Sequence, residues 1–188
     1  CGASYEPACQ PAAGGGSKTA EDSRTGVVRA VPEGMVGVPA GWFWMGCNHE
    51  TDKYCFAGDT WRHVYVDAFA IDRTEVTVAR YRWCVESGVC TEPGKGSFCN
   101  WGREGRDDHP VNCVDWQQAT QFCEWAGQRL PREAEWEKAA RGESGAKYPW
   151  GDVEFGVATK KWANIADETA KRELPRFVPF VAEGYDDG

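Results

Sequence analysis

The 188-residue sequence lacks three features that would assign it to a large class of proteins. No uninterrupted apolar run approaches the roughly 20 residues that a helix needs to cross a bilayer. Lysine and arginine are scattered instead of forming a basic stripe, and the formal charge of −8 disfavours binding to nucleic acid. No two cysteines have the C-x-x-C spacing of zinc ribbons and thioredoxin-like sites. The sequence therefore argues against membrane-spanning, nucleic-acid-binding and zinc-ribbon proteins.

Cysteine is nevertheless abundant, with nine in the chain. Disulfides formed in an oxidising compartment explain this number better than reduced thiols, although buried free thiols remain the alternative. Each disulfide would contribute about 2 to 4 kcal/mol to stability. Short spacings favour three pairs, which are Cys84 with Cys90, Cys47 with Cys55, and Cys99 with Cys113.

The N-terminal residues are rich in glycine, alanine, proline and serine and show no hydrophobic period. We therefore expect residues 1–30 to form a flexible tether and residues 31–188 to form one domain. A chain that starts at Cys1, with no initiator methionine and no signal peptide, resembles a mature bacterial lipoprotein. Acyl chains on Cys1 would anchor it in the cell envelope, and Gly2 favours the outer membrane, on its periplasmic or surface side. The alternatives are an arbitrary chain boundary or an ordinary disulfide cysteine.

Capping residues predict three helices after a region of short strands within residues 27–47 and 63–72. Thr77 and Asp115 are placed to begin the first two helices, the second with a capping box completed by Gln118. The third is predicted within residues 131–142, where acids lie near the start and bases near the end. Its expected buried face consists of Trp136, Ala139 and Ala140. These charges and apolar residues favour a structural helix over a catalytic one.

Four stretches carry a resemblance to a known family: "VPAGWFWMGC", "AIDRTEVTVARYRWCV", "HPVNCVDWQQATQFCEWAGQRLPREAEWEKAARG" and "YPWGD", in this order. Together they resemble the formylglycine-generating enzyme or sulfatase-modifying factor domain. The resemblance implies an α+β fold related to C-type lectins, with little regular secondary structure and incomplete at its C-terminus. Active members oxidise a cysteine of unfolded sulfatases to formylglycine with copper held by a cysteine pair, whereas other members use the scaffold differently or as a binding surface.

Two metal expectations follow from the resemblance. The family's copper-binding thiols belong to a later part of the domain that is not found in these residues, so copper is not expected in this chain. Structural calcium is expected, held by the Asn164 side chain, the Ile165 carbonyl and Asp187, with Asp186 as the alternative carboxylate. The competing interpretation is that the two aspartates form a solvated turn.

Two further positions depart from what the resemblance implies. The family counterpart of Cys123 tends to pair with a late cysteine, so Cys123 and Cys9 are expected to stay unpaired unless they bond to each other. Arg132 stands where the family usually has a threonine N-cap, so that cap is expected to be missing or replaced.

The leading functional hypothesis is a lipid-anchored envelope protein with a non-catalytic binding or assembly module and no catalytic residues of its own. Its partner would be an envelope protein complex, a surface polymer or the remaining half of the domain. One alternative is the N-terminal part of an active formylglycine-generating oxidase whose copper-binding cysteines lie elsewhere. The other is a lectin-like displayed ligand-binding domain. The tryptophans are interpreted mainly as core residues.

Overall fold

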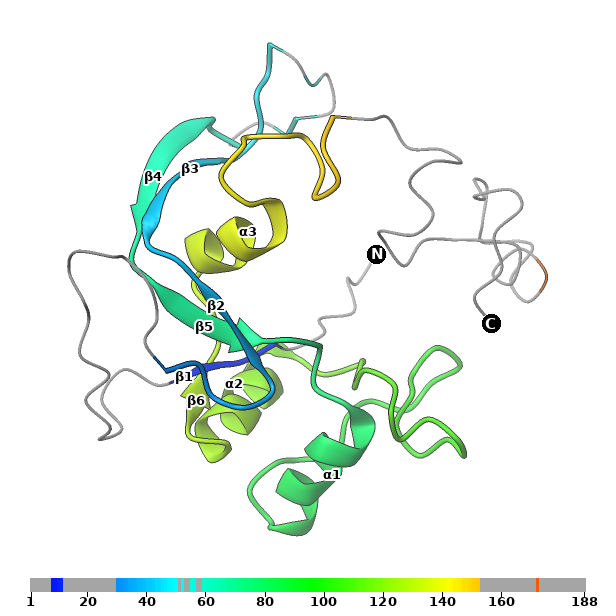
Figure 1. Cartoon of the computed structure of the whole chain (residues 1–188). Helices are drawn as coiled ribbons and strands as arrows, with labels where there is room; N and C mark the ends of the chain where they lie inside the picture. The colour runs from blue at the N-terminus through cyan, green and yellow to red at the C-terminus, as the bar shows by residue number, and fades with distance from the viewer. Residues whose placement is uncertain are drawn as a thin grey trace. The chain divides into compact units, whose positions relative to one another are not determined.

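The computed structural model describes residues 8–11, 30–50, 52, 55, 56, 59–152 and 172. The chain divides into two compact units, one of residues 1–43 and 63–139 and the other of residues 44–62 and 140–188. Within the described part, no helix is both long and apolar enough to cross a membrane. The elements of this part have an α+β composition, as the sequence predicts (Figure 1). They are β1 (Gln10–Pro11), β2 (Met35–Val38), β3 (Gly41–Met45), β4 (Arg62–Val66), β5 (Phe69–Asp72), α1 (Val78–Glu86), α2 (Trp116–Trp125), β6 (Gln128–Arg129) and α3 (Glu133–Arg141).

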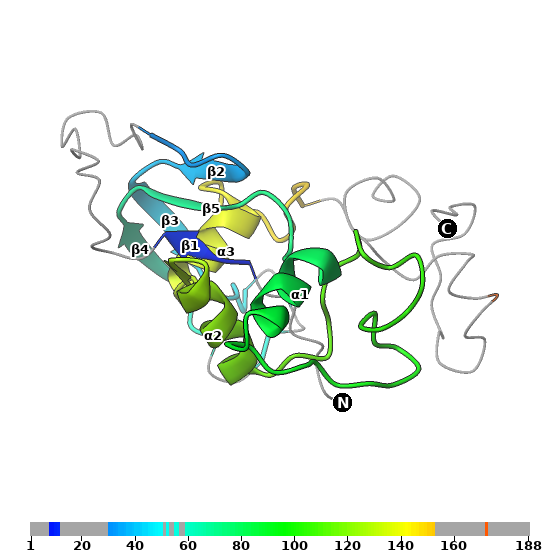
Figure 2. The same cartoon turned by 90° about the horizontal axis from the view of Figure 1, so that it is seen from below.

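Short strand pairs make up the β structure of the described residues. β2 pairs with β5 in antiparallel orientation, with Met35 opposite Asp72 and Val38 opposite Phe69. β1 pairs with β6, also antiparallel, and the Asp72 N–H donates to the Cys9 carbonyl at 3.0 Å beside β1. A third pair consists of β3 and β4. Cys9 and β1 therefore connect β5 with β6, two segments far apart in sequence. Figure 2 shows β1 beside β5.

The first two helices begin at the capping residues that the sequence predicts. The Thr77 hydroxyl accepts a hydrogen bond from a backbone N–H in the first turn of α1. Asp115 and Gln118 form a capping box at the start of α2, because each side chain accepts from the other residue's backbone N–H. Such caps contribute about 1 kcal/mol each, since they pair amide groups that the helix cannot satisfy itself. Both helices are followed closely by a glycine with positive φ, Gly88 and Gly127.

A buried cluster of the described residues contains side chains of both α1 and α2. Tyr81 and Phe122 are fully buried, and their rings stack with centroids 5.4 Å apart. The Tyr81 hydroxyl donates to the Thr91 carbonyl at 3.1 Å, and burial, together with the Asp115 carboxylate, raises its pKa to about 12. Tyr81 is therefore a neutral packing residue. The other buried members are Cys9, Val76, Val78, Cys84, Cys90, Val111, Val114 and Cys123.

Residues 8–11 contribute to this core, which corrects the prediction that residues 1–30 form only a tether. Cys9 is completely buried and forms a disulfide with Cys123 of α2, across a sequence separation of 114 residues. The two cysteines that the resemblance left unpaired therefore bond to each other. Composition did not reveal this contact, because a disulfide and a few backbone hydrogen bonds hold the segment instead of a hydrophobic period. Residues 1–7 and 12–29 lie outside the described residues.

The other six described cysteines form three disulfides across short loops. They are the pairs that the short spacings predict, Cys47–Cys55, Cys84–Cys90 and Cys99–Cys113. The chain reverses directly after α1, and the Cys90 N–H donates to the Cys84 carbonyl at 3.2 Å. All eight described cysteines are thus bonded to another cysteine.

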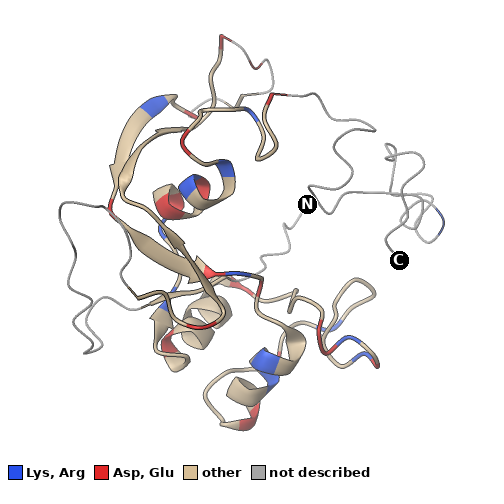
Figure 3. Ribbon diagram, viewed as in Figure 1, with Lys and Arg blue, Asp and Glu red and all other residues tan. Residues whose placement is uncertain are grey.

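Helix α3 buries charged side chains, which corrects the face that the sequence predicts for it. Trp136 is 56% exposed, and Ala139 and Ala140 are also exposed. Glu135 and Lys138 are instead 7% and 2% exposed. Acidic and basic residues therefore occupy the inner side of this helix, whose charges are visible in Figure 3.

Each of these buried charges has hydrogen-bond partners, as burial of a charge requires. The Glu135 carboxylate accepts two hydrogen bonds from the Arg129 guanidinium, at 2.7 and 2.8 Å, and one from the Arg132 N–H at 2.7 Å. The last of these bonds is the half of a capping box that the N3 side chain provides, and the arginine side chain cannot accept the other half as a threonine hydroxyl would. The Lys138 ammonium donates at 2.8 and 3.0 Å to the carbonyls of Pro39 and Gly41.

Candidate functional site

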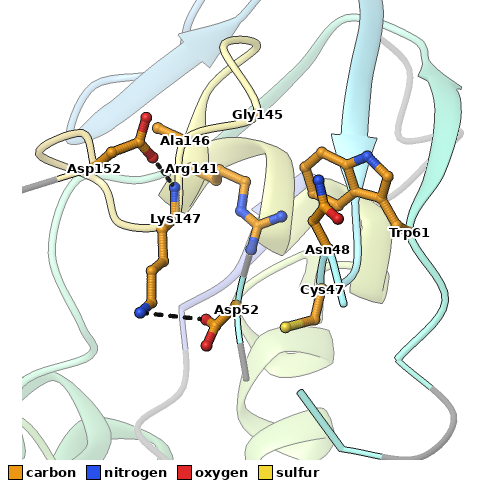
Figure 4. Close-up of a pocket in the computed structure, with 9 residues that line it drawn as sticks. All are labelled: Cys47, Asn48, Asp52, Trp61, Arg141, Gly145, Ala146, Lys147 and Asp152. Carbon is orange, nitrogen blue, oxygen red and sulfur yellow. Dashed lines mark hydrogen bonds and ion pairs between the residues drawn. The ribbon is translucent and has the colours of Figure 1, made fainter. Parts of the chain in front are cut away.

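The second unit contains a small polar pocket of about 340 Å³, including the solvent at its mouth. Two separate segments of the sequence line it, one before β4 and one that begins at the end of α3 (Figure 4). The lining residues are Cys47, Asn48, Asp52, Trp61, Arg141, Gly145, Ala146, Lys147 and Asp152.

A close backbone contact holds one wall of the pocket. Gly46 has a φ of 91°, and a Cβ built on it would lie 2.2 Å from the Thr60 carbonyl oxygen. Only glycine permits this approach. Cys47 and Thr60 form an isolated β-bridge, and the Cys47–Cys55 disulfide closes the intervening loop. The wall is therefore fixed by backbone pairing and by a covalent bond.

Arg141 is a structural clamp in this pocket. Its guanidinium donates to the Gly46 carbonyl at 2.6 Å and to the Trp44 carbonyl at 3.3 Å. It also lies 5.6 Å from the centre of the Trp61 ring, which stacks on Trp44 at 5.1 Å. These contacts hold the charge of Arg141 against the polypeptide backbone and the indole.

The other charged groups of the pocket contact one another. The Lys147 ammonium lies 3.5 Å from the Asp52 carboxylate, and the Lys147 N–H donates to Asp152 at 2.8 Å (Figure 4). The lining residues include no histidine, and the sulfur of Cys47 is bonded to Cys55. The pocket can hold a small polar group, but it offers no thiol nucleophile. The pocket was not expected from the sequence, because its lining residues come from two distant segments that share no motif.

The charged stretch "GREGRDDHP" has a structural role at the start of α1. The Ala79 N–H of α1 donates to the Asp107 carbonyl at 2.9 Å, and the Val78 N–H donates to the His109 carbonyl at the same distance. These bonds satisfy first-turn amides that the helix leaves unpaired. Asp107 also accepts from Arg82 at 2.6 Å, and this hydrogen bond lowers the pKa of the exposed Asp107 carboxyl.

The described cysteines do not fit a copper site. Such a site requires two soft thiolates that converge on Cu(I). Each of the eight described sulfurs is instead covalently bonded to a second sulfur. The part of the chain that the structure describes therefore provides no ligand pair for copper.

The remaining candidate site residues of the sequence analysis lie outside the described residues. These are Asn164, Ile165, Asp186 and Asp187 for calcium, and Cys1 for lipidation. They stay predictions.

Comparison with known proteins gives the same family for most of the chain. Residues 21–180 match the sulfatase-modifying factor enzyme 1-like domain. The formylglycine-generating enzyme of Streptomyces coelicolor is 59% identical over 106 residues, which are 56% of this chain and 33% of that protein. The formylglycine-generating enzyme of Bos taurus is 34% identical over 164 residues, 64% of this chain and 43% of that protein.

A third relative carries a different name. The inactive C-alpha-formylglycine-generating enzyme 2 of Bos taurus is 52% identical over 80 residues, 42% of this chain and 25% of that protein. The chain spans less than half the length of each of these three relatives. Since the matched domain covers residues 21–180 of 188, the chain belongs to the sulfatase-modifying factor family of formylglycine-generating enzyme domains.

Proposed function

We propose that this chain is the disulfide-braced scaffold of a formylglycine-generating-enzyme-like domain and acts in binding or assembly instead of catalysis. The observation that supports this role is the pairing of all eight described cysteines in disulfides. Copper-dependent oxidation of a substrate cysteine would need reduced thiolates, which the described residues do not supply. The polar pocket adds a site for a small ligand but no reactive sulfur.

The chain with its disulfides intact is expected to leave a cysteine-containing sulfatase peptide unchanged when Cu(I) and oxygen are supplied. The measurement is mass spectrometry of the peptide, which detects conversion of cysteine to the aldehyde. The Streptomyces coelicolor relative, assayed under the same conditions, is the positive control. Turnover by this chain would contradict the scaffold role.

A second candidate function is supported by the 59% identity to the Streptomyces coelicolor enzyme over 106 residues. In that case the chain is the N-terminal part of an active sulfatase-maturing oxidase, and the copper-binding cysteines lie outside these 188 residues. This candidate is supported if a longer native protein converts the sulfatase peptide in a copper-dependent reaction and this chain does not. A lectin-like displayed domain remains a third candidate, through the fold that the family resemblance implies.

The proposed location is the bacterial cell envelope, with acyl chains on Cys1 as the anchor to the outer membrane. Each buried methylene of an acyl chain contributes roughly 0.8 kcal/mol, so several chains anchor stably. Protein purified from its native membrane is expected to show acyl mass on the peptide that contains Cys1. An unmodified Cys1 in that material would remove the anchor from the account.

Calcium is proposed as a structural ion held by Asn164, the Ile165 carbonyl and Asp187, with Asp186 as the alternative. Oxygen ligands of this kind suit a hard cation. Removal of calcium by a chelator is expected to lower the melting temperature, because an ion that binds only the folded state stabilises it. Asn164→Ala should show a smaller effect of the chelator. An unchanged melting temperature of the native protein would count against these ligands.

A further inference from the structure

The strand pair β3–β4 carries an exposed group of aromatic rings. In β3, Phe43 is fully buried whereas its neighbour Trp42 is 56% exposed. In β4, His63 and Tyr65 alternate in the same way with the buried Val66, and Tyr65 is 49% exposed. Because successive residues of a strand point to opposite faces, the three exposed rings share the outer face. We call Trp42, His63 and Tyr65 the aromatic platform.

The three rings of the aromatic platform contact one another. The centres of the Trp42 and His63 rings are 5.0 Å apart with planes at 27°, and the Tyr65 ring meets Trp42 edge-on at 5.5 Å. Cross-strand aromatic pairs of this kind contribute roughly 0.2 to 1 kcal/mol to pairing of the strands. That contribution does not require an exposed indole, since β-branched polar residues such as threonine also suit the solvent face of a strand. Strand stability alone therefore does not explain why aromatic rings are exposed at these three positions.

The two strands that carry the platform have few charged residues, which bears on the class of ligand that the platform would bind. β3 contains no charged residue, and the only charged residue of β4 is Arg62 at its start (Figure 3). The Arg62 guanidinium donates to the Met45 sulfur at 3.4 Å. A charged ligand would find no row of opposite charges along these two strands. This favours a neutral ligand over a phosphate, a nucleic acid or an acidic peptide.

The polar atoms of the platform narrow the choice further. Trp42 brings an indole N–H and Tyr65 a phenol hydroxyl, each at the edge of an apolar ring. A purely apolar ligand would leave these groups desolvated and unpaired, which costs binding energy. A sugar ring has a flat C–H face that packs on an aromatic ring and neutral hydroxyls at its edge that pair with such groups.

We propose that the Trp42–His63–Tyr65 platform binds the sugar rings of a neutral carbohydrate polymer. This site goes beyond the scaffold role and does not depend on it, because no cysteine takes part. It is also separate from the polar pocket, none of whose lining residues belongs to the platform.

The test measures binding of the intact chain to cello-oligosaccharides and to N-acetylated chito-oligosaccharides. Calorimetry and tryptophan fluorescence are the two readouts. Trp42→Ala is expected to weaken binding about tenfold, because one stacking contact is lost. Trp42→Phe keeps an aromatic ring and is expected to weaken binding by less. The matched control is Trp116→Ala, which removes an indole of similar exposure, 65%, from the start of α2. It should leave the affinity unchanged.

Three outcomes would overturn the proposal. The first is that the wild-type chain binds neither class of oligosaccharide. The second is that Trp42→Ala and Trp116→Ala weaken binding equally. The third is that Trp42→Ala abolishes a concentration-dependent dimer without affecting sugar binding, which would assign the platform to contact with a second copy. Trp42→Phe keeps the test decisive if Trp42→Ala fails to fold. None of these results affects the peptide-turnover assay, so the two proposals fail independently.

Discussion

Replacement of both Cys9 and Cys123 by alanine is expected to lower the free energy of unfolding by about 4 to 5 kcal/mol. The disulfide closes a loop with a sequence separation of 114 residues, and long loops lose the most entropy in the unfolded state when they are closed. Its loss also releases residues 8–11, whose backbone pairs with β5 and β6. Urea unfolding of the non-reduced proteins measures the effect, and hydrogen exchange at Gln10 and Arg129 should increase.

The matched control is the double variant Cys84→Ala with Cys90→Ala. This pair is also buried but spans a separation of only 6 residues. The same entropic argument gives a loss of about 2 to 2.5 kcal/mol, roughly half of that for the long loop. Equal losses in the two double variants would show that chain entropy is not the reason. Unchanged stability in the first would show that residues 8–11 are not held in the core.

The variant Glu135→Gln is expected to lower the free energy of unfolding at pH 7 by about 2 kcal/mol. Burial by itself raises the pKa of Glu135, but hydrogen bonds from Arg129 and from the Arg132 N–H outweigh it and hold that pKa below its ordinary value. The amide oxygen of glutamine can accept from Arg129 and from the Arg132 N–H, but its NH2 group cannot accept the second hydrogen bond from Arg129. The variant also leaves the Arg129 guanidinium without its counter-charge.

The pH dependence has a definite sign. Since the pKa of Glu135 is lower in the folded state, its stabilisation is complete above about pH 5 and is lost as the pH falls through the folded-state value. The difference between wild type and Glu135→Gln should therefore shrink as the solution is acidified. Glu133→Gln, at an exposed position of the same first turn, is the control and should cost only a few tenths of a kcal/mol. A difference that stays constant down to pH 3 would contradict this role of Glu135.

Local sequence signals predicted the features that local interactions determine. Thr77 and Asp115 cap α1 and α2 as expected, because a cap depends on residues within one turn. Cys84–Cys90 followed from spacing for a similar reason, since the chain reverses within six residues. The order of family motifs likewise identified the domain that the comparisons show.

Features that depend on distant partners were not predictable in this way. Periodicity placed Trp136 on the buried face of α3. Lys138 is buried there instead, because the carbonyls of Pro39 and Gly41 accept hydrogen bonds from its ammonium group. Nothing in the α3 segment indicates those acceptors. The Cys9–Cys123 bond and the pocket around Arg141 and Lys147 likewise join segments far apart in the sequence.

We propose that the eight described cysteines stabilise the fold as disulfides instead of binding copper. A disulfide map of the folded, non-reduced protein tests this proposal. Thiols are alkylated before and after denaturation, and the protein is then digested and analysed by mass spectrometry. We expect linked peptides for the four disulfide pairs of the structure, with none of the eight cysteines alkylated. Two alkylated cysteines in the folded protein, together with stoichiometric binding of Cu(I), would contradict it.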